Sequence, residues 1–532
     1  MTALLGVVIG VLATLLVSDV VRGRHTVRVG DRSWEKLNVI LGQVEQNYVD
    51  SVDHNAVTEA AVSAALSSLD PHSVYLPPVE LKEADTDLAS NFEGIGIQFN
   101  VPSDTAVVLE VIPGGPSEKA GLRKGDRILK VDTTVIAGRK FPQDSMVRRM
   151  KGPSGTKVAI LVERDGQKVP FEITRGKIPL HSIDASFMID DSTAYVRLSK
   201  FSRSTFSESL SALSSLSKQG MRRLVFDVRG NAGGYMDQAL LLSNLFLPAK
   251  AGIVYLEGRH RKRDDYYADG KGPFKDLSLA VLIDQNSASS SEIFAGAMQD
   301  NDRGIVVGRR SFGKGLVQEP VYFSDGSGIR LTVSRFYTPS GRCIQKPYSS
   351  DYQYDLYKRY SGGEFFAADS IKIDSSKVYH TVGGRTVYGG GGIVPDVFVP
   401  MDTTRATKFF IECDRKATSM RYAAYIFDRF KYSLSPIDSY PALERFLEGL
   451  NIPVTFRDFA LRKDGIKATD EEWEKSAPYM LPQIRALVGR YSALGENVFY
   501  KLYLPVDEVV KAAMKALGTT AEQGAPESAT GR

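Results

Sequence analysis

The chain has 532 residues, of which 43% are hydrophobic and 24% are charged, so it has enough apolar material for three or four folded domains. Its formal net charge of +4 is small for this length and argues against a nucleic-acid partner. The two cysteines, Cys343 and Cys413, and the six scattered histidines predict no disulfide framework, no metal site and no cofactor, although the two thiols could be free or could form one bridge.

An almost continuously apolar segment, residues 3–17, lies near the start of the chain. It is short for a transmembrane helix and fits a signal peptide or an inner-membrane signal-anchor within residues 1–21. Arg22, Arg24 and Arg28 follow it, and by the positive-inside rule basic residues on this side argue against export. A buried core helix is a third interpretation of the same segment.

Residues 34–91 are expected to form a helical region. Apolar residues recur at helical spacing from Leu37 to Tyr48, and Asp53 is placed to cap a second helix that ends before Asp70. The sequence LDPHSVY follows, and we interpret its His72 as a structural residue at the helix end rather than a catalytic one.

The pattern changes to short strands and glycine turns over residues 92–177. The run GIGI (Gly94, Ile95, Gly96 and Ile97) resembles the start of a PDZ domain, which implies that its backbone N–H groups hold the terminal carboxylate of a peptide while the peptide adds as a strand to the sheet edge. The later GGPSEKAGLRKGDRILKVD, residues 114–132, fits a short helix followed by a strand. Together the two segments resemble a PDZ domain, which implies an unfolded tail with apolar terminal residues as the ligand.

A strand-helix-strand-helix pattern runs over residues 193–248 and is typical of a parallel sheet. Strands are expected at residues 195–198 and 224–228, and helices at residues 206–216 and 236–246. The turn DVRGNAGGYMDQ joins the second strand to the second helix, and its Gly233 and Gly234 let the main chain approach a ligand closely. The turn is a poor match to the dinucleotide-binding glycine pattern, so no nucleotide site is expected.

Residues 279–318 combine a serine cluster with a single lysine. A short apolar run, residues 279–283, predicts a buried strand, and the apolar spacing beyond the serines predicts a helix. The serines therefore mark a helix N-terminus, where unpaired N–H groups and the helix dipole would stabilise an oxyanion. They are Ser287, Ser289, Ser290 and Ser291.

A second predicted strand, residues 305–307, leads to Lys314, which lies between two glycines. A lysine can accept the proton of a serine only as a neutral amine, which requires a pKa ~3 below its usual ~10.4 and costs roughly 4 kcal/mol that burial can impose. A phosphate-binding loop is a rival interpretation, because Gly308 to Lys314 matches G-x-x-x-x-G-K. Gly315 replaces the expected Ser or Thr, and residues 316–323 look like a strand where a helix should begin.

The sequences SASSSEIFAGAMQD and GRRSFGKGLVQ resemble the active-site signature of the carboxyl-terminal processing peptidases, or tail-specific proteases, which use a serine and a lysine without a histidine. The resemblance implies that Ser289 is the nucleophile, that Lys314 is the general base and that Gln318 orients the lysine. It further implies an oxyanion hole built from the N–H of Gly233 or Gly234 and the N–H of Ser290. We interpret Asp227 and Arg229 as structural residues that orient the glycine turn.

The segments GRCIQKPY and GGGGIVPDVFVP also resemble this family and complete a peptidase core over residues 178–402. An insertion of about residues 348–388 is expected to be a lid or a plain solvated loop. Helical periodicity over residues 403–517 predicts a C-terminal domain that could form a homo-oligomer or cradle substrate, and residues 518–532 are expected to be disordered.

We therefore expect a multidomain α/β protein with a crotonase-like ββα peptidase core, an inserted PDZ domain, and helical regions at both ends. The resemblance implies a serine endopeptidase of the periplasm or cell envelope that cleaves exported proteins after recognising their apolar C-terminal tails. We follow this implication over the basic residues behind the apolar segment, which argue against export. Two alternatives remain open. The protein could be a catalytically silent PDZ scaffold, or a crotonase-like acyl-transfer enzyme.

Overall fold

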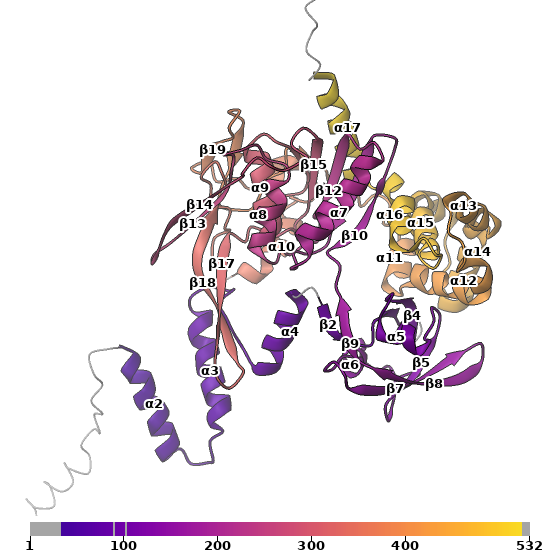
Figure 1. Ribbon diagram of the computed structural model, residues 1–532, viewed down its shortest axis with the longest axis horizontal. Coiled ribbons are helices and arrows are strands. Elements are labelled where there is room, and N and C mark those ends of the chain that lie inside the picture. Colours follow the sequence, from indigo (N-terminus) through magenta and orange to yellow (C-terminus); the bar gives the residue numbers. More distant parts are fainter. Residues whose placement is uncertain (1–32, 89–90, 102–103, 350, 524–532) are drawn as a thin grey trace, which may run out of the picture. The chain divides into compact units, whose positions relative to one another are not determined.

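The computed structural model describes residues 33–88, 91–101, 104–349 and 351–523 (Figure 1). The chain divides into two compact units after Asp70. The first unit contains α2 (Ser33–Asn47) and α3 (His54–Ser67). Asp53 caps α3 as predicted, because its carboxylate accepts the backbone N–H groups of Asn55 and Ala56.

The expected signal or anchor segment, residues 1–21, lies outside the described residues. None of the described helices combines the length and the apolar content needed to cross a membrane. Cys343 and Cys413 are both free thiols, so the alternative of one bridge is wrong.

The second unit is organised around a six-stranded sheet with the order β10-β11-β12-β15-β16-β21. The strands from β11 onward are parallel to one another, and β10 is antiparallel at one edge. The expected strands at residues 195–198, 224–228, 279–283 and 305–307 are confirmed. The six strands are β10 (Ile183–Met188), β11 (Thr193–Leu198), β12 (Arg223–Asp227), β15 (Ser278–Ile283), β16 (Ile305–Gly308) and β21 (Val397–Phe398).

Helices cover both faces of this sheet (Figure 1). One face packs against α7 (Thr205–Lys218), α8 (Met236–Asn244) and α9 (Ser290–Asp300) in the largest hydrophobic core. The other face packs against α17 (Glu508–Gln523), which lies against the alternate strand residues Val225, Ala280 and Leu282. Strands buried on both faces explain the continuous apolar runs in the sequence. Helix α17 extends into residues 518–532, which were expected to be disordered.

A second, antiparallel sheet has the order β1-β18-β13-β14, with β17 also paired to β18. It carries the segment after the lysine loop, since β17 begins two residues beyond Lys314. This strand confirms the sequence argument against a phosphate-binding loop. The strands are β1 (Val74–Leu76), β13 (Gly252–Gly258), β14 (Arg261–Tyr267), β17 (Leu316–Tyr322) and β18 (Gly328–Tyr337).

A third sheet, with its own hydrophobic core, occupies the glycine-rich region after α4 (Pro78–Leu88). Its order is β3-β4-β5-β7-β8, with the short β6 (Thr134–Val135) on β5. The helices α5 (Pro116–Ala120) and α6 (Gln143–Met150) accompany it, and a small β2–β9 pair, Asn91–Gly94 with Gly176–Pro179, flanks it. The strands are β3 (Ile97–Asn100), β4 (Ala106–Val111), β5 (Arg127–Val131), β7 (Lys157–Arg164) and β8 (Gln167–Thr174).

The insertion and the C-terminal region contain mostly short elements and helices, respectively. The insertion holds η1 (Tyr352–Tyr354), α10 (Asp355–Ser361), η2 (Ala368–Ser370), β19 (Val378–His380) and β20 (Thr386–Tyr388). The C-terminal helices share one aromatic-rich core. They are α11 (Lys408–Arg415), α12 (Thr418–Leu434), α13 (Tyr440–Gly449), α14 (Ile452–Asp464), α15 (Asp470–Gly489) and α16 (Gly495–Tyr503), followed by η3 (Leu504–Val506).

Candidate active site

Three loops that carry the predicted site residues leave the same edge of the six-stranded sheet. The parallel register aligns Asp227 with Leu282 and Ile283 with Gly308, so β12, β15 and β16 end side by side. The glycine turn follows β12, the serine cluster follows β15 and the lysine loop follows β16. Carboxyl ends of adjacent parallel strands are the usual place for a site in such a sheet.

Ser289 lies on a sharp turn between β15 and α9. Its backbone has φ 55° and ψ −114°, which is unusual for a residue with a side chain. It is the N-cap of α9, and its side chain is only partly buried, whereas every residue of α9 is buried. A serine held on a strained strand-to-helix turn projects its hydroxyl from the sheet edge, as a nucleophile requires.

The carboxylate of Glu292 ties the serine turn to the lysine loop. Its Oε2 accepts the N–H of Ser289 at 2.8 Å and the N–H of Lys314 at 2.9 Å. Its Oε1 accepts the hydroxyl of Ser311 at 2.5 Å and the N–H of Gly313 at 2.7 Å. The backbone nitrogens of Ser289 and Lys314 therefore bond the same oxygen atom, which makes the serine turn and the lysine loop direct neighbours. Burial raises the pKa of Glu292, and the four donors oppose that rise.

Glu292 was not among the predicted site residues, although it is an acid in the first turn of α9. Its position three residues after the N-cap is the signal of a reciprocal cap, which could have identified the bond to the Ser289 N–H. Its bonds to the lysine loop have no such signal, because that loop is 21 and 22 residues further along the chain.

The glycine turn packs directly against the serine turn. A Cβ atom at Gly233 would lie 2.8 Å from the Cβ of Ser289 and 2.9 Å from the nitrogen of Ser290, and a Cβ at Gly234 would lie 2.1 Å from the carbonyl oxygen of Phe201. Both glycines have positive φ, 98° and 146°. Only residues without a side chain fit this close approach.

The N–H groups of this turn do not all have the same partners. The N–H of Gly233 donates to Oδ1 of Asn231 at 2.9 Å, whereas the N–H groups of Gly234 and Ser290 donate to no group among the described residues. The hydroxyl of Ser290 donates to the carbonyl oxygen of Gly234 at 2.9 Å and so holds the two segments together. Of the two alternatives, Gly234 therefore has the available donor in this conformation.

Gln318 on β17 holds the amine of Lys314. Nζ of Lys314 donates to Oε1 of Gln318 at 2.9 Å, and Nε2 of Gln318 donates to the carbonyl oxygen of His72 at 2.5 Å. The second bond fixes which way the amide of Gln318 points, so its oxygen faces the lysine. His72 contributes its main chain here, in agreement with the structural role predicted for it.

The insertion also reaches this network. The hydroxyl of Tyr352 lies 2.7 Å from Nε2 of His72 and accepts Nε2 of Gln345 at 3.3 Å, and Oε1 of Gln345 accepts the N–H of Gly315 at 2.9 Å. Tyr352 is only 7% exposed. Tyr352 is therefore linked through Gln345 to Gly315, which follows Lys314, and directly to His72, which bonds Gln318. The interpretation of residues 348–388 as a plain solvated loop is wrong at this position. One tyrosine among the several of this polar insertion gives no sequence signal for such a contact.

Asp227 and Arg229 anchor the start of the glycine turn. The completely buried carboxylate of Asp227 accepts bonds from Tyr195, Arg197 and Arg229, and Arg229 also bonds Asp507 at the start of α17. Burial raises the pKa of Asp227, but the charges of the two arginines outweigh it and lower the pKa to about 2. The contacts agree with a structural role for both residues and leave neither as a proton carrier.

The predicted carboxylate-binding run lies between β2 and β3. The carbonyl oxygens of Ile95 and Gly96 accept the N–H groups of Ser117 and Ile112, whereas the N–H groups of Ile95 and Gly96 donate to no group in the described part of the chain. Gly94 and Ile97 are the adjoining ends of β2 and β3. Since β3 is a terminal strand of its sheet, its outer edge can accept a further strand.

Two other kinds of site find no support in this geometry. The N–H groups of Gly313 and Lys314, which a phosphate would require, are bonded to Glu292. The described residues contain no group of three or more His, Cys, Asp and Glu side chains that could hold a metal ion.

Parts of this chain are similar to known protein families and to a solved structure. Residues 192–354 match Peptidase family S41, and residues 94–174 match the PDZ domain. A solved photosystem II D1 C-terminal processing protease is 28% identical, with 70% of this chain and 88% of that chain covered and a TM-score of 0.39.

Two curated relatives come from Bacillus subtilis (strain 168). The carboxy-terminal processing protease CtpA is 31% identical over 326 residues, which cover 61% of this chain and 69% of the relative. The carboxy-terminal processing protease CtpB is 32% identical over 353 residues, which cover 65% of this chain and 72% of the relative. The chain therefore belongs to the carboxy-terminal processing proteases of peptidase family S41 and is a serine-type peptidase with a PDZ domain.

Proposed function

We propose that the protein is an endopeptidase that cleaves polypeptides through a Ser289–Lys314 dyad. The neutral amine of Lys314 accepts the proton of the Ser289 hydroxyl as its Oγ bonds to the carbonyl carbon of the scissile peptide. The C–N bond then breaks, and the leaving amine takes the proton from Lys314. A water molecule then gives a proton to Lys314 as its oxygen bonds to the acyl carbon. The bond between that carbon and Oγ of Ser289 breaks, and Oγ takes the proton back from Lys314. The new C-terminus leaves and loses its own proton to solvent to become a carboxylate.

The observation that carries this proposal is the shared oxygen of Glu292, which accepts the N–H groups of both Ser289 and Lys314. Gln318 supports the base because its amide oxygen accepts the amine of Lys314 while its amide nitrogen is held by the carbonyl oxygen of His72. The N–H groups of Gly234 and Ser290 supply the oxyanion hole. Ser290 follows Ser289 and bonds the carbonyl oxygen of Gly234, and neither N–H has a partner among the described residues.

The proposal extends to substrate choice and to the core fold. The PDZ domain holds the carboxylate of an apolar C-terminal tail on the N–H groups of Gly94 to Ile97, and the tail adds as a strand beside β3.

The peptidase core is crotonase-like, and the PDZ domain is inserted into it. The substrates are exported proteins, the enzyme lies in the periplasm or cell envelope, and its C-terminal helices form a homo-oligomer. Fractionation of cells and light scattering of the purified protein test these last two assignments.

Catalysis is tested with purified full-length protein, casein and a fluorophosphonate probe. We expect Ser289→Ala and Lys314→Ala to abolish cleavage, and Ser289→Ala to abolish labelling. Ser290→Ala is a matched control on the adjacent serine, because the mechanism uses its N–H and not its hydroxyl, so cleavage should persist. Wild-type protein that cleaves nothing would support the scaffold alternative, and thioester turnover without proteolysis would support acyl transfer.

Tail recognition is tested with two unfolded substrates that differ only in their last three residues. An apolar tail should give a KM about tenfold below that of a tail ending in aspartates, because burial of roughly 60 Å² of apolar surface is worth ~1.4 kcal/mol. Equal KM values for both tails would refute the proposed role of the PDZ domain while leaving the Ser289–Lys314 mechanism intact.

A further inference from the structure

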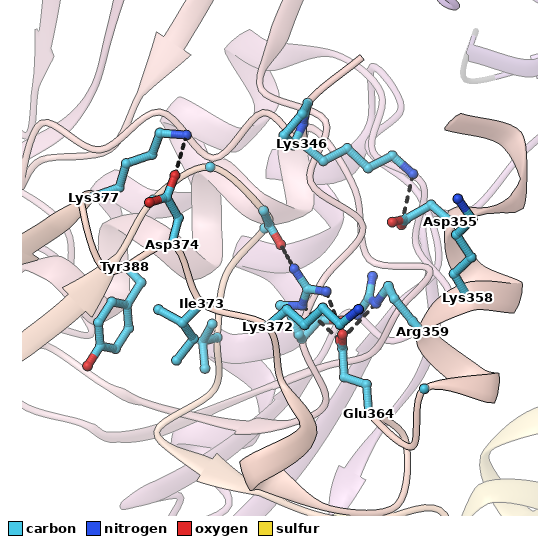
Figure 2. A pocket seen from close by; sticks show the side chains of 18 of the residues that line it. Lys346, Asp355, Lys358, Arg359, Glu364, Lys372, Ile373, Asp374, Lys377 and Tyr388 are labelled. Atoms are coloured by element: carbon cyan, nitrogen blue, oxygen red, sulfur yellow. Dashed lines mark hydrogen bonds and ion pairs between the residues drawn. The ribbon is translucent and has the colours of Figure 1, made fainter. Parts of the chain in front are cut away.

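A cavity of about 410 Å³ lies between the insertion and the glycine loop of residues 389–392 (Figure 2). Its volume is within the range of small-molecule sites. Elements from both sides line it, including α10, the segment of residues 370–374 and the main chain of the four glycines. Loops without side chains let a ligand approach backbone groups closely.

Positive charge dominates the lining of this pocket. It contains six cationic side chains and three carboxylates, so its formal charge is positive. The cations are Arg310, Lys346, Lys358, Arg359, Lys372 and Lys377, and the carboxylates are Asp355, Glu364 and Asp374.

Figure 2 shows that the three carboxylates of the lining are all engaged by cations of the lining, which leaves an excess of positive charge. Lys346 pairs with Asp355 at 3.1 Å and Lys377 pairs with Asp374 at 2.8 Å. Lys358 bonds an aspartate outside the lining, Asp351. Lys372 has no ion pair among the described residues, and it lies between the two lysine–aspartate pairs in this view.

Two guanidinium groups share one carboxylate at the base of the pocket. Arg310 and Arg359 both bond Glu364, at 2.5 Å and 2.8 Å, and Arg359 and Glu364 are only 5% and 4% exposed. Burial lowers the pKa of Arg359, and the neighbouring charge of Arg310 lowers it further. One buried positive charge is therefore uncompensated, and such a charge is costly unless an anion joins it.

We propose that this pocket binds a small anion of the phosphate class, either free phosphate or the phosphate of an organic molecule. Phosphate suits the pocket because its oxygens can accept N–H donors from several lysine and guanidinium groups at once. Lys372 and Lys358 bind it from the solvent side. The site is separate from the one that cleaves peptides, and its occupancy does not depend on the Ser289–Lys314 mechanism.

The same arginine cluster connects the pocket to the lysine loop. Arg359 donates to the carbonyl oxygens of Arg310 and Ser311, at 2.6 Å and 3.0 Å. The hydroxyl of Ser311 in turn donates to Glu292, which holds the N–H of Lys314. A bound anion therefore stabilises the arrangement that positions the loop, and it should raise the thermal stability of this part of the protein.

Isothermal titration calorimetry of the full chain tests the site, with inorganic phosphate as the probe and chloride at equal ionic strength as the reference. Wild-type protein should bind phosphate saturably, Lys372→Gln should weaken binding about tenfold, and the double variant with Lys358→Gln should bind more weakly still. Lys218→Gln, an exposed lysine at the end of α7, makes the same charge change away from the pocket and should bind like wild type.

A second arm uses glycerol phosphate to identify the source of the anion. Tighter binding of glycerol phosphate than of inorganic phosphate indicates an organic ligand, and equal or weaker binding indicates free phosphate. Thermal unfolding without phosphate verifies that the variants fold. The proposal is overturned if wild type shows no saturable binding in either arm, or if Lys372→Gln and Lys218→Gln change the affinity equally.

Discussion

Replacement of Glu292 by glutamine is the sharpest test of how the site is held together. The side chain is completely buried, and both of its oxygens accept two donors. An amide has the same shape but only one accepting oxygen. If that oxygen keeps the N–H groups of Ser289 and Lys314, the NH2 group faces the hydroxyl of Ser311 and the N–H of Gly313. The hydroxyl can rotate to accept, but the backbone N–H cannot.

The expected loss of stability follows from the number of hydrogen bonds that Glu292→Gln weakens or removes. A buried N–H without an acceptor costs about 1–3 kcal/mol, and each remaining bond loses roughly 1 kcal/mol when its acceptor is no longer charged. Removal of a buried charge returns part of its desolvation cost. The free energy of unfolding of the core should therefore fall by about 2–4 kcal/mol, a large part of the ~5–15 kcal/mol of a typical domain. A shift of ~1 Å in Ser289 or Lys314 should lower kcat about 100-fold.

Calorimetry and steady-state hydrolysis of casein measure the two effects. Glu319→Gln is the matched control, because Glu319 lies on β17 and makes only a partly exposed ion pair with Arg261, worth at most about 0.5 kcal/mol. The reasoning is refuted if Glu292→Gln unfolds at the wild-type temperature and keeps kcat within about threefold of wild type.

Three further substitutions test other parts of the site. Gly233→Ala should lower kcat about 100-fold with little change in KM, because the new methyl group displaces Ser289. Tyr352→Phe should lower kcat about tenfold and change the pH profile of kcat, because it removes the hydroxyl that bonds His72 and Gln345 beside the lysine loop. Asp227→Asn should destabilise the protein above pH ~4 and matter less as the pH falls towards 2. The folded-state pKa of Asp227 is about 2, below the usual value of 3.8, so ionisation beside Arg229 stabilises the fold by roughly 2 kcal/mol only while the carboxylate remains charged.

Each of these has an independent check. Gly138→Ala introduces a side chain at a similar positive φ but with nothing within 4 Å, so it separates backbone strain from the clash and should leave kcat unchanged. Tyr354→Phe removes an exposed hydroxyl two residues from Tyr352 and should have no effect on the pH profile. The account of Asp227 fails if the stability difference between wild type and Asp227→Asn, measured by denaturation from pH 5 to pH 2, stays constant.

Local sequence patterns were sufficient for the elements that carry the site. Apolar runs predicted β15, β16 and β17 nearly to the residue, and helical spacing predicted the presence of α9, because burial imposes a period on each element separately. The glycines of the turn after β12 and the serines before α9 were identifiable because their conformations restrict residue type locally.

The contacts between these elements had no comparable signal. The bonds from Glu292 to the lysine loop, from Gln318 to His72 and from Arg229 to Asp507 join residues that lie from about 20 to more than 200 positions apart. A polar side chain in a loop shows what it can bond to, but not which loop will face it. The buried Tyr352 and Arg359 of the insertion were missed for this reason.

The sequence by itself therefore determined the order of strands and helices along the chain and the residue types in the loops that leave the sheet edge. Only the tertiary structure decided that the serine turn, the glycine turn and the lysine loop meet, because that depends on the register of parallel strands. Strand register is set by packing of both sheet faces against helices from distant parts of the chain, including α17 near its end, and no single segment contains that information.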